Sequence, residues 1–245
     1  MNVSLIIPYY KKYNEFQKSL EFNKCQYSLA QEVILIVDHP VVEGFSFFKK
    51  NYPEINFRIF VNQTEHSWRN PSVVINFGIS QCKSNYCIII SPETILLEPN
   101  SIKLLIENTN ENNFSVGRII FLRNDLNFEN NSFINKPLEI NCELLKLFKY
   151  RNTRKHYIIG PVYYGSICCS KKNLNKVNNY TEDFTNWGGE DDDIRNKLIK
   201  SGITCNKIPE VCLLHVETPD EFENRFKINS KKNNDNIINN FVEIV

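Results

Sequence analysis

The 245-residue sequence has almost no net charge and contains no long hydrophobic run. Its 29 Lys and Arg residues balance 28 Asp and Glu residues, so no overall electric field draws the protein to nucleic acid. The apolar N-terminal stretch is stopped by Pro8, and no segment approaches the roughly 20 apolar residues of a membrane helix. We therefore expect a cytoplasmic protein without an integral membrane segment, whose function resides in a local site.

The sequence also lacks any CxxC pair among its eight cysteines, and most of these lie within apolar stretches such as 86–90. Cysteines in that setting are typically buried and reduced, so a disulfide scaffold is not indicated. A chain of this length buries a large enough core to fold without cross-links.

Short apolar segments alternate with amphipathic ones over residues 1–100, which is typical of strands joined by helices in a parallel sheet. The expected strands are 3–7, 33–37, 57–61 and 86–90, and the expected helices are 13–25, 42–50 and 71–82. This pattern predicts an α/β fold with a Rossmann-like, mixed but mostly parallel central sheet flanked by helices. Ligands bind at the carboxyl ends of such strands, which here are followed by 8–12, 38–39, 62–63 and 91–93.

The second half of the chain is less regular. Strands are expected at 116–122, 157–169 and 211–215, with helices at 138–148 and after Gly189. No linker is long enough to separate domains. We therefore predict one domain over 1–245, with halves of about 1–100 and 101–218 followed by a helix and tail over about 219–245.

The most informative stretch is the acidic run at 190–193, which follows Trp187, Gly188 and Gly189. Ile194 and Leu198 mark the buried face of the predicted helix. Glu190 and Asp191 precede Ile194 by four and three residues, so both lie above that face.

The other two acids point elsewhere: Asp192 roughly opposite, and Asp193 toward Lys197. Burying two carboxylates costs free energy unless something uses them. An indole face beside carboxylates suits a sugar, which stacks on the ring and donates hydroxyl hydrogen bonds to the acids. The alternative, that the acids only complement the helix dipole, stays open.

The segment 187–194, with Asn196, Leu198 and Gly202, resembles the acceptor-site motif of β-1,4-galactosyltransferases, shared in looser form by chondroitin-polymerase-type enzymes. The likeness extends to Tyr164, Gly165 and Ser170 before it, and to His215, Arg225 and Phe226 after it. The N-terminal half resembles the nucleotide-sugar half of inverting glycosyltransferase family 2, through 4–8, 37–38, 61–63 and 76–78. The resemblance implies the GT-A fold and covers most of the chain in the correct order.

In such enzymes an Asp deprotonates the acceptor hydroxyl, and the resemblance assigns that role to Asp191. The expected product is a hexose (galactose, glucose or an N-acetylated relative) transferred with inversion from a UDP-sugar to a glycan or glycolipid, as in polysaccharide biosynthesis. The implied acceptor-binding residues are Trp187, Gly188, Gly189, Glu190, Asp192, Tyr164 and Gly165. The implied nucleotide-sugar-binding residues are Pro8, Tyr10, Asp38, Asn62, Arg69, Asn76 and Ser91.

The sequence departs from the family at the metal site, where the Asp-x-Asp pattern is replaced by Ser91-Pro92-Glu93. Glu93 keeps the last acidic position, and His215 matches the third-ligand position. Both side chains are competent ligands for Mn²⁺ or Mg²⁺, so a divalent cation is the implied cofactor. Ser91 carries no charge, so an enzyme with weak or no metal dependence remains an alternative.

Two other functions remain open: a catalytically inactive glycan-binding module and, with less support, a nucleotidyltransferase. The latter would need a Gly-rich phosphate loop after the first strand, and Pro8–Lys12 offers no glycine. The basic cluster at 146–156 is either a solvated loop, a cover for the pyrophosphate, or a peripheral contact with an anionic membrane surface. Lys11 and Lys12 are expected to be exposed at a helix start.

Overall fold

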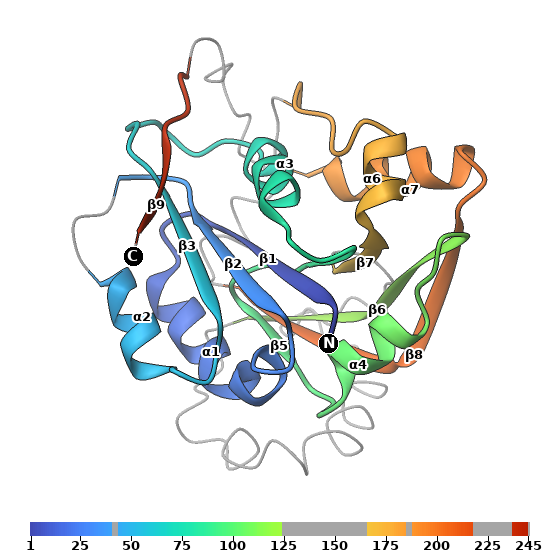
Figure 1. The fold of residues 1–245 in the computed structure, drawn as a ribbon, viewed down its shortest axis with the longest axis horizontal. Coiled ribbons are helices and arrows are strands. Elements are labelled where there is room, and N and C mark those ends of the chain that lie inside the picture. Colours follow the sequence, from blue (N-terminus) through green and yellow to red (C-terminus); the bar gives the residue numbers. More distant parts are fainter. Residues whose placement is uncertain (41–43, 124–165, 185–187, 218–236, 245) are drawn as a thin grey trace.

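The computed structural model describes residues 1–40, 44–123, 166–184, 188–217 and 237–244 (Figure 1). Within these ranges the strands form one sheet in the order β5-β8-β6-β7-β4-β1-β2-β3-β9. Four neighbouring strands run parallel: β1 (Val3–Tyr9), β2 (Glu32–Val37), β3 (Phe57–Asn62) and β4 (Tyr86–Ile89); β6 and β8 form a further parallel pair. The remaining strands are β5 (Thr94–Leu96), β6 (Asn113–Arg123), β7 (Ile167–Ser170), β8 (Thr204–Glu217) and β9 (Phe241–Ile244).

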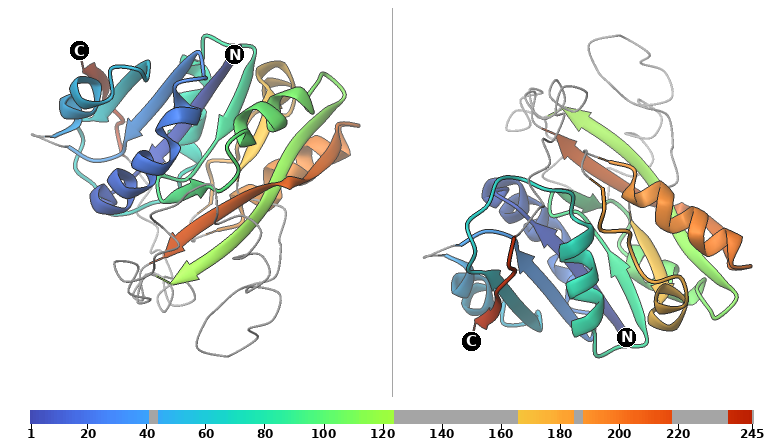
Figure 2. Two further views of the ribbon diagram at one scale, coloured as in Figure 1. Left: turned by 90° about the horizontal axis from the view of Figure 1, so that it is seen from below. Right: turned by 90° about the horizontal axis from the view of Figure 1, so that it is seen from above.

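Helices cover both faces of the sheet (Figure 2). One face packs against α1 (Tyr13–Tyr27), α2 (Phe45–Asn51) and α4 (Ser101–Glu107). The other face packs against α3 (Ser72–Gln81), α6 (Lys171–Lys176) and α7 (Glu190–Lys200). The predicted α/β fold, a mixed central sheet flanked by helices, is therefore confirmed.

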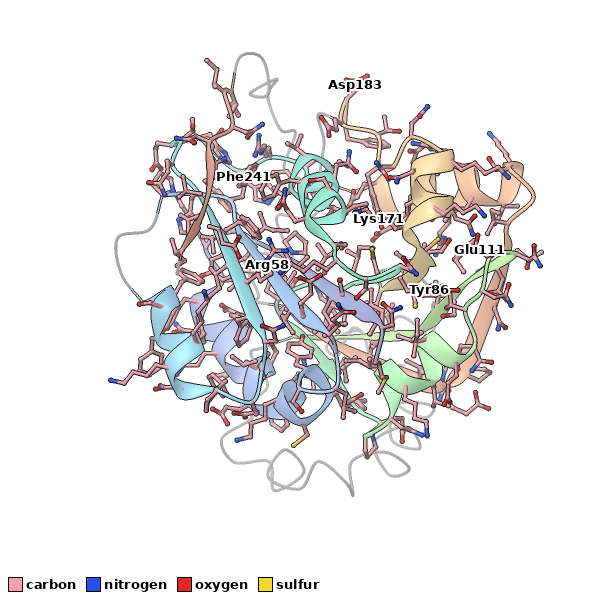
Figure 3. The ribbon with its side chains drawn as sticks, in the orientation of Figure 1. Arg58, Tyr86, Glu111, Lys171, Asp183 and Phe241 are labelled. Carbon is pink, nitrogen blue, oxygen red and sulfur yellow. The ribbon has the colours of Figure 1, made fainter. Side chains whose placement is uncertain are left out.

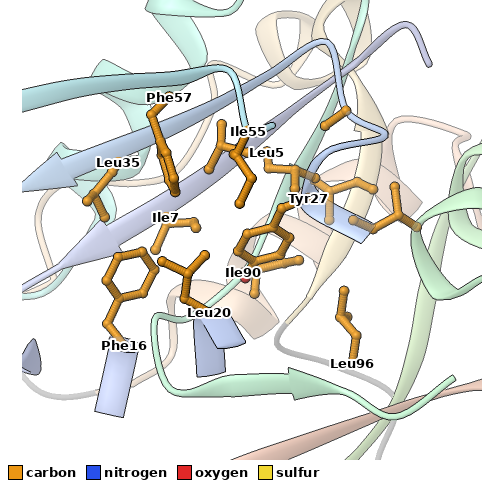
Figure 4. Close-up of a cluster of buried hydrophobic side chains, with 14 of the residues drawn as sticks. Leu5, Ile7, Phe16, Leu20, Tyr27, Leu35, Ile55, Phe57, Ile90 and Leu96 are labelled. Atoms are coloured by element: carbon orange, nitrogen blue, oxygen red, sulfur yellow. The ribbon is translucent and has the colours of Figure 1, made fainter. Parts of the chain in front are cut away.

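The first core layer lies between α1 and the parallel strands. Phe16, Leu20 and Tyr27 of α1 are fully buried against Leu5 and Ile7 of β1 (Figure 4). Each such large apolar side chain contributes about 1.5–3 kcal/mol relative to an exposed one. This layer fixes β1 and β2, whose carboxyl ends lie at the candidate site.

Helix α3 lies unusually close to the sheet because Gly78 faces it. A Cβ atom at Gly78 would lie 2.6 Å from the side chains of both Ile6 and Ile36. Only a residue without a side chain permits this approach. The position of α3 in turn sets the position of Arg69 and Asn70, which immediately precede it.

The strands and helices expected in the N-terminal half are confirmed, with boundaries that differ by a few residues. The sequence did not indicate β5, α4 or α6. Residues 241–244, expected in a tail, instead form β9, which pairs antiparallel with β3. Phe241 stacks on Phe77 of α3 with ring centroids 4.3 Å apart, and Arg58 donates a hydrogen bond from Nε to Glu243 at 2.9 Å. Phe241 and Arg58 are labelled in Figure 3. The expected helix 138–148 and the start of the expected strand 157–169 lie outside the described residues.

Candidate active site

Helix α7 begins at a pair of glycines that the backbone requires. Gly188 and Gly189 have φ angles of +80° and +93°, in the left-handed region that favours glycine. Gly189 starts the helix, its carbonyl accepting a hydrogen bond from the Asp193 backbone N–H at 2.9 Å. This turn brings Glu190 and Asp191 into the first turn of the helix, so both glycines shape the site through the backbone.

The directions predicted for the acidic run are confirmed. Ile194 and Leu198 are fully buried, whereas the Asp192 side chain is 69% exposed and pairs with Arg195 at 2.7 Å. Asp193 accepts a hydrogen bond from Thr181 Oγ1 at 2.6 Å and lies 3.8 Å from Lys197.

Glu190 and Asp191, here called the acidic pair, form the start of α7, and both side chains are partly buried. The pKa of Asp191 is raised to about 8, chiefly by burial and next by the charge of Glu190, while Arg195 opposes the shift. Burial also raises the pKa of Glu190, while its own backbone N–H and the Asn70 side chain favour the charged form. Two like charges this close titrate as a pair, so near neutral pH they hold a proton that a lone carboxyl would lose.

Tyr180 lies close to the acidic pair. Its side chain is 1% exposed, and its hydroxyl has no hydrogen-bond partner among the residues described. Burial raises the pKa of Tyr180 well above its usual value, and Asp191 and Glu190 add to the shift. Tyr180 is therefore a neutral neighbour of the acids.

The carboxyl ends of β1, β2 and β3, here called the strand-end rim, form the second part of the site. The registers Tyr9↔Val37 and Val37↔Val61 bring the following residues together. Tyr10 stacks on His66 with ring centroids 5.9 Å apart and donates its hydroxyl to the His66 carbonyl at 3.2 Å. Tyr10 therefore lies at the rim with its ring packed on the buried His66 side chain.

Asp38 is the charged centre of the strand-end rim and is 3% exposed. Arg69 donates from Nε to Oδ2 at 2.8 Å and from Nη2 to Oδ1 at 2.6 Å. Asn62 donates to Oδ1 at 3.0 Å, and His66 Nε2 lies 3.1 Å from the same oxygen. Burial alone would raise the pKa of Asp38, but His66 and Arg69 hold it below its ordinary value. Direct contact of this carboxylate with a nucleoside would have to displace one of these partners.

The other predicted nucleotide-binding residues are dispersed. Pro8 and Ser91 lie at the ends of β1 and β4, as expected. Asn76 lies on α3, where it donates to the Tyr180 carbonyl and to Glu182, both at 2.8 Å. Its amide thus links α3 to the segment that leads into α7, and a nucleotide contact for Asn76 stays a prediction.

Glu93 and His215 are brought together, as the resemblance implied. The β5–β8 pairing sets Thr94 opposite His215, so His215 Nε2 lies 3.0 Å from Glu93 Oε1. Lys12 Nζ lies 2.7 Å from the same oxygen. Burial alone would raise the pKa of Glu93, but the charges of Lys12 and His215 hold it well below its usual range.

The second carboxylate oxygen of Glu93, Oε2, is the atom of this side chain that is relevant to metal binding. Oε2 is buried and has no hydrogen-bond partner in the described part of the chain. A buried carboxylate oxygen in that state suits a cation. No group of three or more His, Cys, Asp or Glu side chains suited to a metal occurs among the residues described. Within the described ranges, therefore, the metal ligands on offer are those of Glu93 and His215.

Sequence reasoning missed three residues of the site. Lys12, expected to be exposed, is 27% exposed and pairs with Glu93, while Asn70 and Tyr180 adjoin the acidic pair. A lysine at a helix N-terminus is unfavourable unless it has an acidic partner, which was the available signal for Lys12. Trp187, Tyr164 and Gly165, together with the basic cluster and 225–226, lie outside the described residues.

Comparison with known families places the site in context. A family model described as the N-terminal domain of galactosyltransferase matches residues 147–225, which include the start of α7 and His215. No curated protein sequence matches the chain. None of the helices in the described ranges is long and apolar enough to cross a membrane.

Solved structures of low sequence identity share the fold. Mannosyltransferase PcManGT from Pyrobaculum calidifontis, in complex with GDP-Man and Mn²⁺, matches with a TM-score of 0.58 and 13% identity, over 87% of this chain and 56% of that one. TarS 1-349 of S. aureus in complex with UDP-GlcNAc matches with a TM-score of 0.58 and 14% identity, over 89% and 59%. GalNAc-T7 with UDP, GalNAc and Mn²⁺ gives 0.57 and 12%, over 88% and 44%. The fold is GT-A, and the chain spans about half the length of these proteins.

Proposed function

We propose that this glycosyltransferase domain of the GT-A fold transfers a hexose from a UDP-sugar to a hydroxyl of a glycan or glycolipid acceptor, with inversion. The observation that carries the proposal is the position of Asp191 on the inward side of the first turn of α7, within the segment matched by the galactosyltransferase model. The raised pKa of Asp191 supports the same role.

In the proposed reaction, Asp191 removes the proton from the acceptor hydroxyl as its oxygen attacks the anomeric carbon. The bond from that carbon to the UDP oxygen breaks, and UDP leaves from the opposite face. General base catalysis works best when the base has a pKa near the working pH, which burial provides here, and it contributes about 10²–10⁴ in rate. Glu190 orients the acceptor by accepting hydrogen bonds from its other hydroxyls, whereas Asp192, which points away from Asp191 and pairs with Arg195, takes no part in this step.

The donor nucleotide lies along the strand-end rim in this proposal. Tyr10 offers a ring face for the base, and the Asp38–Arg69 pair fixes the adjoining loop. Nucleotide sugars or nucleotides in the solved complexes of similar fold support a nucleotide-sugar donor. The choice of UDP follows from the galactosyltransferase-like segment.

Glu93 and His215 would hold a divalent cation, and the unpartnered Glu93 Oε2 fits that assignment. When bound, Mn²⁺ or Mg²⁺ would neutralise charge on the donor pyrophosphate. Since Glu93 and His215 fill only part of a coordination shell, phosphate oxygens of the donor would supply further ligands. Metal and nucleotide are therefore expected to bind together more strongly than either does alone. Lys12 adds a fixed positive charge beside the same carboxylate.

A panel of nucleotide sugars tests the proposal, with release of UDP or GDP measured with and without Mn²⁺ and with candidate sugar acceptors. We expect release from UDP-galactose, UDP-glucose or an N-acetylated relative, and an Asp191→Asn variant that binds donor but turns over at least a hundredfold more slowly. Glycan binding without nucleotide release from any donor would instead identify a binding module. Near-normal turnover by Asp191→Asn would exclude Asp191 as the base.

A further inference from the structure

A continuous set of buried polar contacts joins the strand-end rim to the acidic pair. Arg69 is held on Asp38 by two hydrogen bonds, and the next residue, Asn70, donates from Nδ2 to Glu190 Oε2 at 3.0 Å. Asp38, Arg69 and Asn70 are 3%, 5% and 2% exposed. The Asn70–Glu190 contact spans 120 residues of sequence and connects the loop before α3 to the start of α7.

The orientation of the Asn70 amide is determined by its own turn. Asn70 Oδ1 accepts hydrogen bonds from the Ser72 backbone N–H at 3.0 Å and from Ser72 Oγ at 2.7 Å. A backbone N–H can only donate, so the oxygen of the amide must face Ser72 and the nitrogen must face Glu190. An asparagine here therefore offers a fixed donor to one carboxylate oxygen, which an aspartate could not do.

We infer that Asn70 is a positioning residue: its amide holds the Glu190 carboxylate at the start of α7 and ties the acidic pair to the strand-end rim through Arg69. The inference rests on the proposed function, because it treats the acidic pair as the acceptor-side chemistry. Asn70 belongs to the N-terminal half of the chain, so the inference assigns the positioning of the acidic pair in part to a residue outside α7.

The groups around Glu190 fix the direction of the expected effect. Asp191 and Asp192 on α7 repel its charge, and Tyr180 from the preceding segment is a neutral neighbour. Asn70 favours the charged form, together with the backbone N–H of Glu190 itself. Loss of the Asn70 donor therefore raises the pKa of Glu190, and a negative charge in its place raises the pKa of both members of the acidic pair.

The decisive variant is Asn70→Asp, which retains an acceptor for Ser72 but loses the donor to Glu190. We expect the acidic limb of kcat/KM to move up by about 0.5–1 pH unit and the acceptor KM to rise about tenfold, while the donor KM changes less than threefold. Asn70→Ala serves as a second variant, with a smaller shift in the same direction. The matched control is Asn173→Asp, which makes the same substitution at a 3% exposed residue of α6 whose amide donates a hydrogen bond to the Glu111 carbonyl. The control should lose stability without moving the pH profile.

A second measurement does not depend on activity. A ¹³C carboxyl NMR titration should show Glu190 titrating at higher pH in Asn70→Asp and Asn70→Ala than in the wild type, and unchanged in Asn173→Asp. An unchanged Glu190 titration in both Asn70 variants would overturn the inference, as would an equal shift in the control. A wild-type protein that transfers no sugar would refute the proposed function alone, because the titration still tests the Asn70 contact.

Discussion

Asp191→Asn should stabilise the protein near neutral pH while it abolishes turnover. The raised pKa means that the folded protein holds a proton at Asp191 that the unfolded chain, with an ordinary pKa of 3.8, releases. Between pH 3.8 and about 8 the folded state binds more protons than the unfolded state, so its stability falls as pH rises. An asparagine does not ionise in either state, so the Asp191→Asn variant is spared this fall in stability with rising pH.

The size of the effect follows from the pKa shift. A shift of about four pH units would correspond to at most roughly 6 kcal/mol at pH 8. Because Glu190 shares the proton and Asp191 is only partly buried, we expect a gain of about 2 kcal/mol, or about 4–8 °C in Tm for a chain of this length. The gain should become small near pH 4 and vanish below pH 3.8, where the carboxyl is protonated in both states.

Thermal melts of the wild type and Asp191→Asn at pH 4, 6, 7 and 8 measure the effect directly. Asp192→Asn is the matched control, because the neighbouring side chain is 69% exposed and pairs only at the surface with Arg195; its Tm should change by about 1 °C or less. If Asp191→Asn were no more stable than the wild type at pH 8, or if the difference did not grow with pH, the reasoning that places Asp191 in a desolvated site would be wrong.

Three further predictions concern the metal site and the sheet. Glu93→Gln and His215→Ala should each weaken Mn²⁺-dependent UDP binding at least tenfold by calorimetry, and unchanged binding in both would remove them from the site. Lys12→Gln should raise the affinity for Mn²⁺ alone, since it removes an ammonium 2.7 Å from Glu93; equal or lower affinity would contradict that view. Gly78→Ala should cost about 1–3 kcal/mol in urea unfolding, because its Cβ would lie 2.6 Å from two isoleucines, and a neutral result would mean that α3 shifts freely.

Local patterns carried most of what the sequence could predict. The spacing of Ile194 and Leu198 determined which acids face inward, because helix periodicity relates residues only three or four apart. The apolar runs of the parallel strands predicted their burial, which the structure confirms. The edge at which a ligand binds stays a prediction from the general rule for such sheets.

The contacts that could not be predicted join distant parts of the chain. Lys12 meets Glu93 across 81 residues, and Asn70 meets Glu190 across 120. The local sequence around each residue does not indicate its partner, because these contacts depend on how α1, α3 and α7 pack on the sheet. For the same reason the pairing of β9 with β3 was missed: a four-residue strand that follows an asparagine-rich stretch has no periodicity of its own to indicate a partner.

Strand β9 covers the edge of β3 and becomes the edge of the sheet in its place, as a strand of only four residues. Without it, β3 would present a row of unsatisfied backbone N–H and C=O groups, a template on which a second molecule could add a strand. The two residues before β9 also form hydrogen bonds with the Asn62 side chain. The Asn240 N–H donates to Asn62 Oδ1 at 3.2 Å, and Asn62 Nδ2 donates to Asn239 Oδ1 at 3.3 Å. A deletion of 237–245 would therefore do two things at once: it would promote aggregation along β3, and it would free the asparagine that supports Asp38.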